Sequence, residues 1–168
     1  NTRPPLLICL MAASMTLFGA SEWALRLPSA LAALGTLAVT MAFTWRLTRS
    51  AATAFLACAL LVASPGFHGV HAAATGDYDA LLTLFTTSYL CVLFFTLHRR
   101  VPPRRWVLWA GVLIAAAILT KGVAGLIPGA GVAVYLLFVR RWTRPFVRPR
   151  YLIAAGVILL ATGVFYGL

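Results

Sequence analysis

Acidic side chains are scarce in this sequence, which has three Asp and Glu residues among 168. Charged residues of both signs make up 10% of the chain, hydrophobic residues make up 62%, and the mean hydropathy is +0.94. Soluble domains usually carry about 25% charged residues. The composition therefore excludes an ordinary soluble domain and predicts an integral membrane protein that is entirely α-helical.

Cysteine and histidine are also few. Cys9, Cys58 and Cys91 each lie inside an apolar run without a partner at metal-ligand or disulfide spacing, so we expect small core residues. His68 and His71 are three residues apart, but a Ser-Pro-Gly break precedes them and no carboxylate stands at ligand spacing. The sequence predicts no metal site and no certain cofactor in this chain.

Basic residues dominate the charge, with 14 Lys and Arg residues and a formal net charge of +11. Such a charge often indicates nucleic-acid binding. Here the basic residues cluster at the ends of apolar runs, and no polar globular segment is present to read a groove. The pattern excludes nucleic acid as a partner and favours membrane lipids with anionic headgroups.

The apolar runs predict a polytopic helical bundle of about six spans within one transmembrane domain covering residues 1–168. An N-terminal helix over residues 4–18 is too short for the roughly 20 residues that a span needs, so we expect it to be interfacial or re-entrant. The chain begins without Met and ends inside an apolar run, and we expect it to be truncated at both ends. The expected spans are about 26–47, 51–67, 79–97, 105–120, 123–139 and 151–168.

The basic residues also predict which side of the membrane each turn faces. If the spans alternate, the turns near 46–51, 98–105 and 140–150 share one side and carry all but three of the 14 basic residues. The positive-inside rule makes that side cytoplasmic. Every acidic residue then lies on the opposite, non-cytoplasmic side, where we expect the functional site.

Asp77 and Asp79 are the first candidates for that site. Asp79 begins an expected span, so its carboxylate is either a cap that complements the helix dipole or a group that binds substrate or a neighbouring cation. Asp77 carries the same two interpretations, and its position is more typical of a loop.

Two cations are candidates for binding an anion. Lys121 lies at a Thr-Lys-Gly break between two spans and either extends to the interface or binds an anion or Asp79. Arg3 precedes a Pro-Pro pair at a helix start, where a guanidinium favours phosphate. Glu22 and Arg26 are equally well explained as interface anchors. The glycines between residues 122 and 131 predict either close helix packing or a kink that opens a cavity for a lipid.

Three strings taken together resemble a known family: RPPLLICLMAASMTLFGASEWALRLPSALAALGTL, TGDYDALLTLF and AILTKGVAGLIP. They are similar to the dolichyl-phosphate-mannose–protein mannosyltransferase superfamily, and within it to the bacterial members that include the aminoarabinose transferase of lipid A. The resemblance covers nearly the whole chain, in order. It implies the GT-C fold, which has many membrane helices, interfacial helices in a large first external loop and often a soluble external domain at the C-terminus.

The resemblance also implies roles for single residues. Arg3 stands where the family usually has a lysine that helps to hold a lipid phosphate. Asp79 is the acid of the D-x-L-L-T segment at the active-site edge, and Lys121 is the lysine of the L-T-K-G string. The family's catalytic aspartate lies upstream of the Pro-Pro pair, so we expect Asp79 to support catalysis and this chain alone to be inactive. Thr2 replaces a frequent acidic residue, which leaves a divalent metal only as a possibility for the full-length protein.

The expected function is that of a membrane glycosyltransferase that moves a sugar from a polyprenyl-phosphate donor to a lipid or protein acceptor. We expect a multi-pass protein of the bacterial inner membrane whose active face is non-cytoplasmic. The alternative is a transporter or flippase-like protein for lipid-linked anions, in which the same cations would line the pathway.

Overall fold

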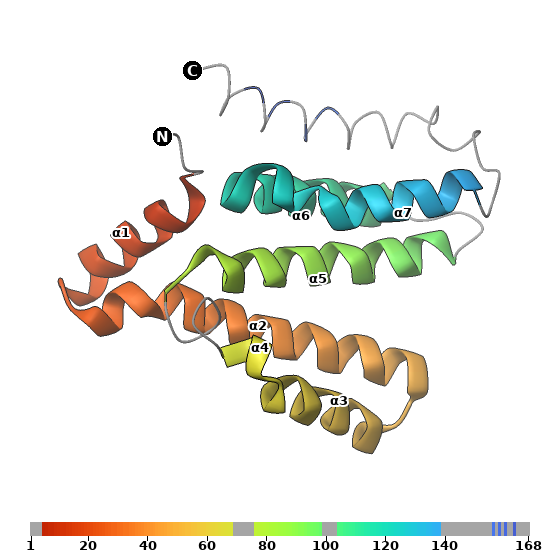
Figure 1. Cartoon of the computed structure of the whole chain (residues 1–168), viewed down its shortest axis with the longest axis horizontal. Coiled ribbons are helices and arrows are strands. Elements are labelled where there is room, and N and C mark those ends of the chain that lie inside the picture. The colour runs from red at the N-terminus through yellow and green to blue at the C-terminus, as the bar shows by residue number, and fades with distance from the viewer. Residues whose placement is uncertain are drawn as a thin grey trace. The chain divides into compact units, whose positions relative to one another are not determined.

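The structure is a computed structural model that describes residues 5–68, 76–98 and 104–138, together with positions 156, 158, 160 and 163. Within these residues the secondary structure is helical throughout (Figure 1). The helices are α1 (Leu6–Phe18), α2 (Glu22–Thr48), α3 (Ala51–Ala63), α4 (Pro65–His68), α5 (Tyr78–Leu97), α6 (Arg104–Lys121), the 3₁₀ turn η1 (Gly122–Gly125) and α7 (Ile127–Phe138).

Among the described residues, three helices are long and apolar enough to cross a membrane: Glu22–Thr48, Tyr78–Leu97 and Arg105–Gly125. The expected all-α polytopic membrane fold is confirmed by these helices. The contacts divide the chain into two compact units, one formed by Pro5–Thr87 and the other by the described residues from Ser88 onward. The expectation of one transmembrane domain across residues 1–168 stays a prediction.

In the first unit, α1 and α2 are joined through a carbonyl group that a proline leaves without its helical partner. Pro28 lies inside α2 and has no N–H to donate to the carbonyl of Ala24, four residues earlier. The hydroxyl of Ser14 on α1 donates to that carbonyl at 2.6 Å, and both residues are buried. Because a buried carbonyl needs a donor, this bond satisfies α2 and fixes α1 against it.

Helix α2 begins four residues before the expected residue 26. Ser21 adopts an extended conformation and its hydroxyl accepts the N–H of Ala24 at 3.2 Å, which caps the helix. Glu22 lies in the first turn, where a carboxylate complements the helix dipole. At the other end Arg49 has a φ of 56° and its N–H donates to the carbonyl of Trp45, which ends α2.

Helix α3 packs antiparallel against α2 and is much shorter. It has 13 residues against 27 in α2, which corresponds to about 20 Å against about 40 Å. Figure 1 shows α3 beside only part of α2. The expected span 51–67 is therefore divided into α3 and α4, because Pro65 favours the extended backbone that Ser64 adopts, with a ψ of 125°.

In the second unit, the chain turns sharply between α6 and α7. Gly122 has a φ of 61°, a conformation that side chains disfavour, and it ends α6 directly after Lys121. A Cβ atom on Gly125 would lie 2.5 Å from the carbonyl carbon of Ala117, so the backbone of η1 lies directly against α6. Close packing thus accounts for Gly125, and α7 begins at Ile127 instead of residue 123. The expected span 151–168 lies almost entirely outside the described residues.

Candidate functional site

Helix α2 gives a scale for depth in the membrane. Arg26 and Arg46 mark two heights along α2, which we call the Arg26 level and the Arg46 level. The roughly 20 helical residues between them correspond to ~30 Å, the thickness of a bilayer's hydrocarbon core. Trp23 and Trp45 lie beside these levels and are largely exposed, as expected for aromatic side chains at an interface. The length and composition of α2 therefore match a hydrocarbon layer bounded by Arg26 and Arg46.

The start of α5 lies against α2 within one or two turns of Arg26. The hydroxyl of Ser29 donates to the carbonyl of Asp77 at 3.4 Å. Just below, Ala32 forms a buried cluster with Leu7, Ala80 and Leu81. The two aspartates are thus held near the Arg26 level, at the end of the first unit that is opposite to Arg46 and Arg49.

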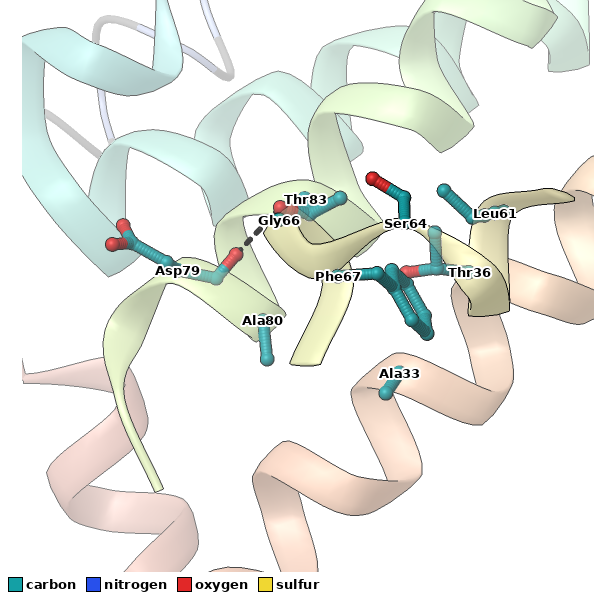
Figure 2. A pocket seen from close by; sticks show the side chains of 9 residues that line it. All are labelled: Ala33, Thr36, Leu61, Ser64, Gly66, Phe67, Asp79, Ala80 and Thr83. Atoms are coloured by element: carbon teal, nitrogen blue, oxygen red, sulfur yellow. Dashed lines mark hydrogen bonds between the residues drawn. The ribbon is translucent and has the colours of Figure 1, made fainter. Parts of the chain in front are cut away.

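A cavity of about 200 Å³ opens beside Asp79 in the first unit. Three of its lining residues carry hydroxyl groups, one carries an aromatic ring and one a carboxyl group. The lining residues are Ala33, Thr36, Leu61, Ser64, Gly66, Phe67, Asp79, Ala80 and Thr83 (Figure 2). The cavity combines an apolar wall with a few polar groups, which is the usual composition of a small-molecule site.

Asp79 lies at the rim of this cavity, in the first turn of α5. Its backbone carbonyl accepts the hydroxyl of Thr83 at 2.7 Å. Figure 2 shows its carboxylate directed away from the side chains of Ser64 and Phe67. Asp79 is half-buried and lies at a helix N-terminus, where a negative charge complements the helix dipole.

Asp77 precedes α5 and its carboxylate accepts the N–H of Tyr78, the first residue of the helix, at 2.6 Å. This contact satisfies one of the backbone donors that a helix start leaves unpaired. The contact gives the Asp77 carboxylate a structural use at the helix start, and its role in substrate binding stays a prediction.

Lys121 is the last residue of α6 and its side chain is exposed. A cation in the last turn of a helix complements the helix dipole. Asp77 and Asp79 lie together at the start of α5 in the first unit, and Lys121 belongs to the second unit. Arg3 lies outside the described residues.

Glu22 and Arg26 form an ion pair one turn apart on α2, with 75% and 54% of their side chains exposed. Pairs this exposed contribute little to stability. The geometry agrees with interface anchors.

Tyr89 is the clearest polar residue that the sequence interpretation missed. It is fully buried on α5, donates its hydroxyl to the carbonyl of Gly125 at 3.0 Å, and accepts the N–H of Gly129 at 3.0 Å. Its sequence neighbourhood gives no indication of this role. The only signal was the glycine-rich segment that it contacts.

The described residues contain no group of three or more His, Cys, Asp and Glu side chains placed to hold a metal ion. Cys9, Cys58 and Cys91 are free cysteines, and Cys58 is buried and Cys91 half-buried. Cys9 is exposed on α1, so the expectation of a core residue is wrong at that position. His71 and the side chain of His68 lie outside the described part of the chain.

The sequence matches the dolichyl-phosphate-mannose-protein mannosyltransferase family over residues 2–166. No curated protein matches it. Two crystal structures of ArnT from Cupriavidus metallidurans resemble this chain over 99% of its length. The apo structure gives a TM-score of 0.77 at 27% identity, and the structure bound to undecaprenyl phosphate gives 0.81 at 26% identity. This chain spans 31% of the length of ArnT.

These matches confirm the expected polytopic GT-C fold, because the likeness to ArnT includes almost every residue of the chain. The family match likewise covers both units, with the Asp79 cavity in one and Lys121 in the other. The chain belongs to the dolichyl-phosphate-mannose-protein mannosyltransferase family.

Proposed function

We propose that this chain is part of a membrane glycosyltransferase that transfers a sugar from a polyprenyl-phosphate donor to a lipid or protein acceptor. Membership of a mannosyltransferase family supports the reaction class. The likeness to ArnT bound to undecaprenyl phosphate supports the donor class. The observation that carries the proposal within this chain is Asp79 at the rim of a cavity, at the end of the first unit opposite to Arg46 and within about two helical turns of the Arg26 level.

The proposed chemistry assigns complementary roles to the candidate residues. When the sugar leaves its carrier, negative charge grows on the phosphate oxygens, and fixed cations there stabilise the transition state. Lys121 and Arg3 are the proposed cations, and Asp79 orients a cation or the acceptor. Asp77 remains a proposed substrate contact through its carboxylate, alongside its capping bond. The carboxylate that takes the acceptor's proton is proposed to come from another segment of the full-length protein.

The proposed active face is non-cytoplasmic, in the inner membrane of a bacterial cell. The arginine-rich turn at Arg46 and Arg49 supports a cytoplasmic position for that end of α2. Asp77 and Asp79 lie toward the other end, where Ser29 and Ala32 contact the start of α5. A lipid-linked phosphate at the non-cytoplasmic interface would meet these acids without crossing the hydrocarbon.

Substitution of Asp79 tests the proposal in the full-length protein. Asp79→Asn keeps the shape of the side chain and removes its charge, so we expect sugar transfer to fall at least tenfold, or about 1.4 kcal/mol in transition-state stabilisation. The measurement is the rate at which reconstituted protein transfers sugar from a polyprenyl-phosphate donor.

The matched control is Glu22→Gln, which neutralises another acid in the first turn of a helix but lies in an exposed ion pair. We expect its transfer rate to stay within twofold of the unmodified protein. Near-normal transfer by Asp79→Asn would remove Asp79 from the site. Movement of the lipid across the membrane without any glycosyl product would instead favour the transporter.

A further inference from the structure

The hydroxyl of Tyr89 occupies the place of a missing hydrogen bond in a helix. In a continuous α-helix the N–H of Gly129 would donate to the carbonyl of Gly125, four residues earlier. Here the Gly129 N–H donates to the Tyr89 hydroxyl, and the same hydroxyl donates to the Gly125 carbonyl, each at 3.0 Å. Tyr89 therefore satisfies both groups and holds them apart.

A break of this kind needs such a partner inside a membrane protein. Backbone groups that leave the helical pattern must be satisfied by side chains, neighbouring helices or water, because the hydrocarbon offers no partner. Insertion of a side chain between residues four apart is a known cause of sharp helix kinks. Tyr89 is fully buried, and its hydroxyl makes one bond as donor and one as acceptor to the two ends of the break.

Lys121 lies directly before the break between α6 and α7. Helix α6 ends at Lys121, and the four residues of η1 lead directly to Gly125. The backbone of Gly125 lies against Ala117 so closely that a Cβ atom would come within 2.5 Å of it. The position of Lys121 is thus set from one side by α6 and from the other by a short turn whose far end Tyr89 holds.

We propose that Tyr89 is a positioning residue that fixes the α6–α7 break and thereby places the ammonium group of Lys121 for binding a phosphate. This inference rests on the proposed role of Lys121. Without the hydroxyl, Gly129 can bond directly to Gly125 and extend α7 backward, or both groups stay buried without partners. The first change moves η1 and the lysine that precedes it, and the second loosens the turn that holds them.

Tyr89→Phe tests the proposal because it removes one oxygen atom and keeps the packing of the ring. In the full-length protein reconstituted in lipid nanodiscs, we expect undecaprenyl phosphate to bind about tenfold more weakly, comparable to the loss of one buried hydrogen bond. The matched control is Thr96→Val, which removes another buried hydroxyl from α5 that bonds only to the carbonyl of Val92 in the same helix. Its binding should stay within twofold of the unmodified protein.

Two further measurements separate positioning from stability. If Tyr89 acts through Lys121, the double variant Tyr89→Phe with Lys121→Ala should bind no more weakly than Lys121→Ala alone, since coupled residues are not additive. Amide exchange measured by mass spectrometry should accelerate about tenfold across residues 122–130 in Tyr89→Phe and stay unchanged in α2.

The outcomes distinguish this inference from the proposed function. Weaker binding in Lys121→Ala with normal binding in Tyr89→Phe would overturn the positioning role alone. Fully additive losses would also overturn it, because Tyr89 would then act independently of Lys121. Normal binding in both single variants would overturn the proposed role of Lys121 and this inference with it.

Discussion

At the scale of single residues, the charged candidates lie at helix ends, where a charge already has a structural use. Asp77 accepts the first N–H of α5, Asp79 lies in its first turn, and Lys121 ends α6. Each charge therefore stabilises its helix through the dipole by about 0.3–1 kcal/mol. A test of function must separate that contribution from binding.

A comparison of Lys121 with Arg46 separates the helix-dipole contribution from phosphate binding, because both are cations in the last turn of a membrane helix. We expect Lys121→Ala to weaken undecaprenyl-phosphate binding by the full-length protein at least tenfold, since the phosphate loses a fixed positive charge. Arg46→Ala should lose a similar helix-dipole contribution and change binding less than twofold. The measurement is equilibrium binding by both variants at the same ionic strength.

Equal losses in the two variants would show that the effect comes from helix stability or net charge. Raising the salt concentration adds a second check. Because the Lys121 side chain is exposed, the affinity difference between Lys121→Ala and the unmodified protein should shrink as salt screens the charge.

Ionisable site candidates could be predicted from the sequence, because charged residues are rare in an apolar chain and a functional role is one of the few reasons for keeping them. The structural roles of hydroxyl groups could not be predicted in this way. Ser14 and Tyr89 lie in ordinary apolar stretches, and their importance comes from backbone groups 10 to 40 residues away. Those groups lack partners only because Pro28 and the glycine-rich break interrupt their helices, which becomes visible when the helices are packed.

At the scale of elements, the first unit depends on how α1 docks on α2. The carbonyl of Ala24 is buried, loses its helical donor to Pro28, and receives the Ser14 hydroxyl instead. A long helix with an internal proline would otherwise carry an unsatisfied group. Pro28 and Ser14 therefore act together: the proline leaves the Ala24 carbonyl without its helical donor, and the serine supplies another donor.

Ser14→Ala should destabilise the full-length protein by about 1–3 kcal/mol, because it leaves the Ala24 carbonyl buried without a donor. Thr16→Ala removes an exposed hydroxyl on the same helix that bonds only to Ala13, and should stay within about 0.5 kcal/mol. Thermal or denaturant unfolding of the purified variants in one detergent measures the difference. Equal stability of the two variants would contradict the role assigned to Ser14.

The sequence predicted the existence of each described helix longer than one turn, but several ends were wrong. Apolar composition cannot show where α3 ends at Ala63, because the run remains apolar on either side of the Ser-Pro-Gly break. The start of α7 was similarly placed too early, since residues 122–125 form a 3₁₀ turn against α6. These ends are set by Pro65, Gly122 and Gly125 through backbone conformation and close approach.

At the scale of the whole molecule, two compact units belong to a chain that spans 31% of the ArnT length. In the first unit, the basic turn at Arg46 and Arg49 and the two aspartates lie toward opposite ends of α2. This separation is what the count of basic residues in the turns predicts. It does not depend on the family resemblance.

Cysteine labelling tests the orientation in intact cells. We expect a cysteine at Ala20, in the exposed turn before α2, to react with a membrane-impermeant maleimide added outside the cytoplasmic membrane. A cysteine at Thr48, exposed at the other end of α2, should react only after the cells are opened. Both variants are made in a background in which the native cysteines are replaced, and labelling is read by mass shift.

The reverse pattern would invert the topology and place Asp79 on the cytoplasmic side. Reaction of both cysteines before lysis would indicate leaky cells. A cytosolic protein with an accessible cysteine serves as the control for that case.

The shortness of α3 has a consequence for the lipid around it. A helix of about 20 Å is about 10 Å shorter than a 30 Å hydrocarbon layer. Bilayers meet such a mismatch by thinning locally. Lipid headgroups beside Ser64 and Gly66 would then lie closer to the Asp79 cavity. The phosphate of a polyprenyl lipid could reach the Asp79 carboxylate below the average membrane surface while the polyprenyl chain stays in the hydrocarbon.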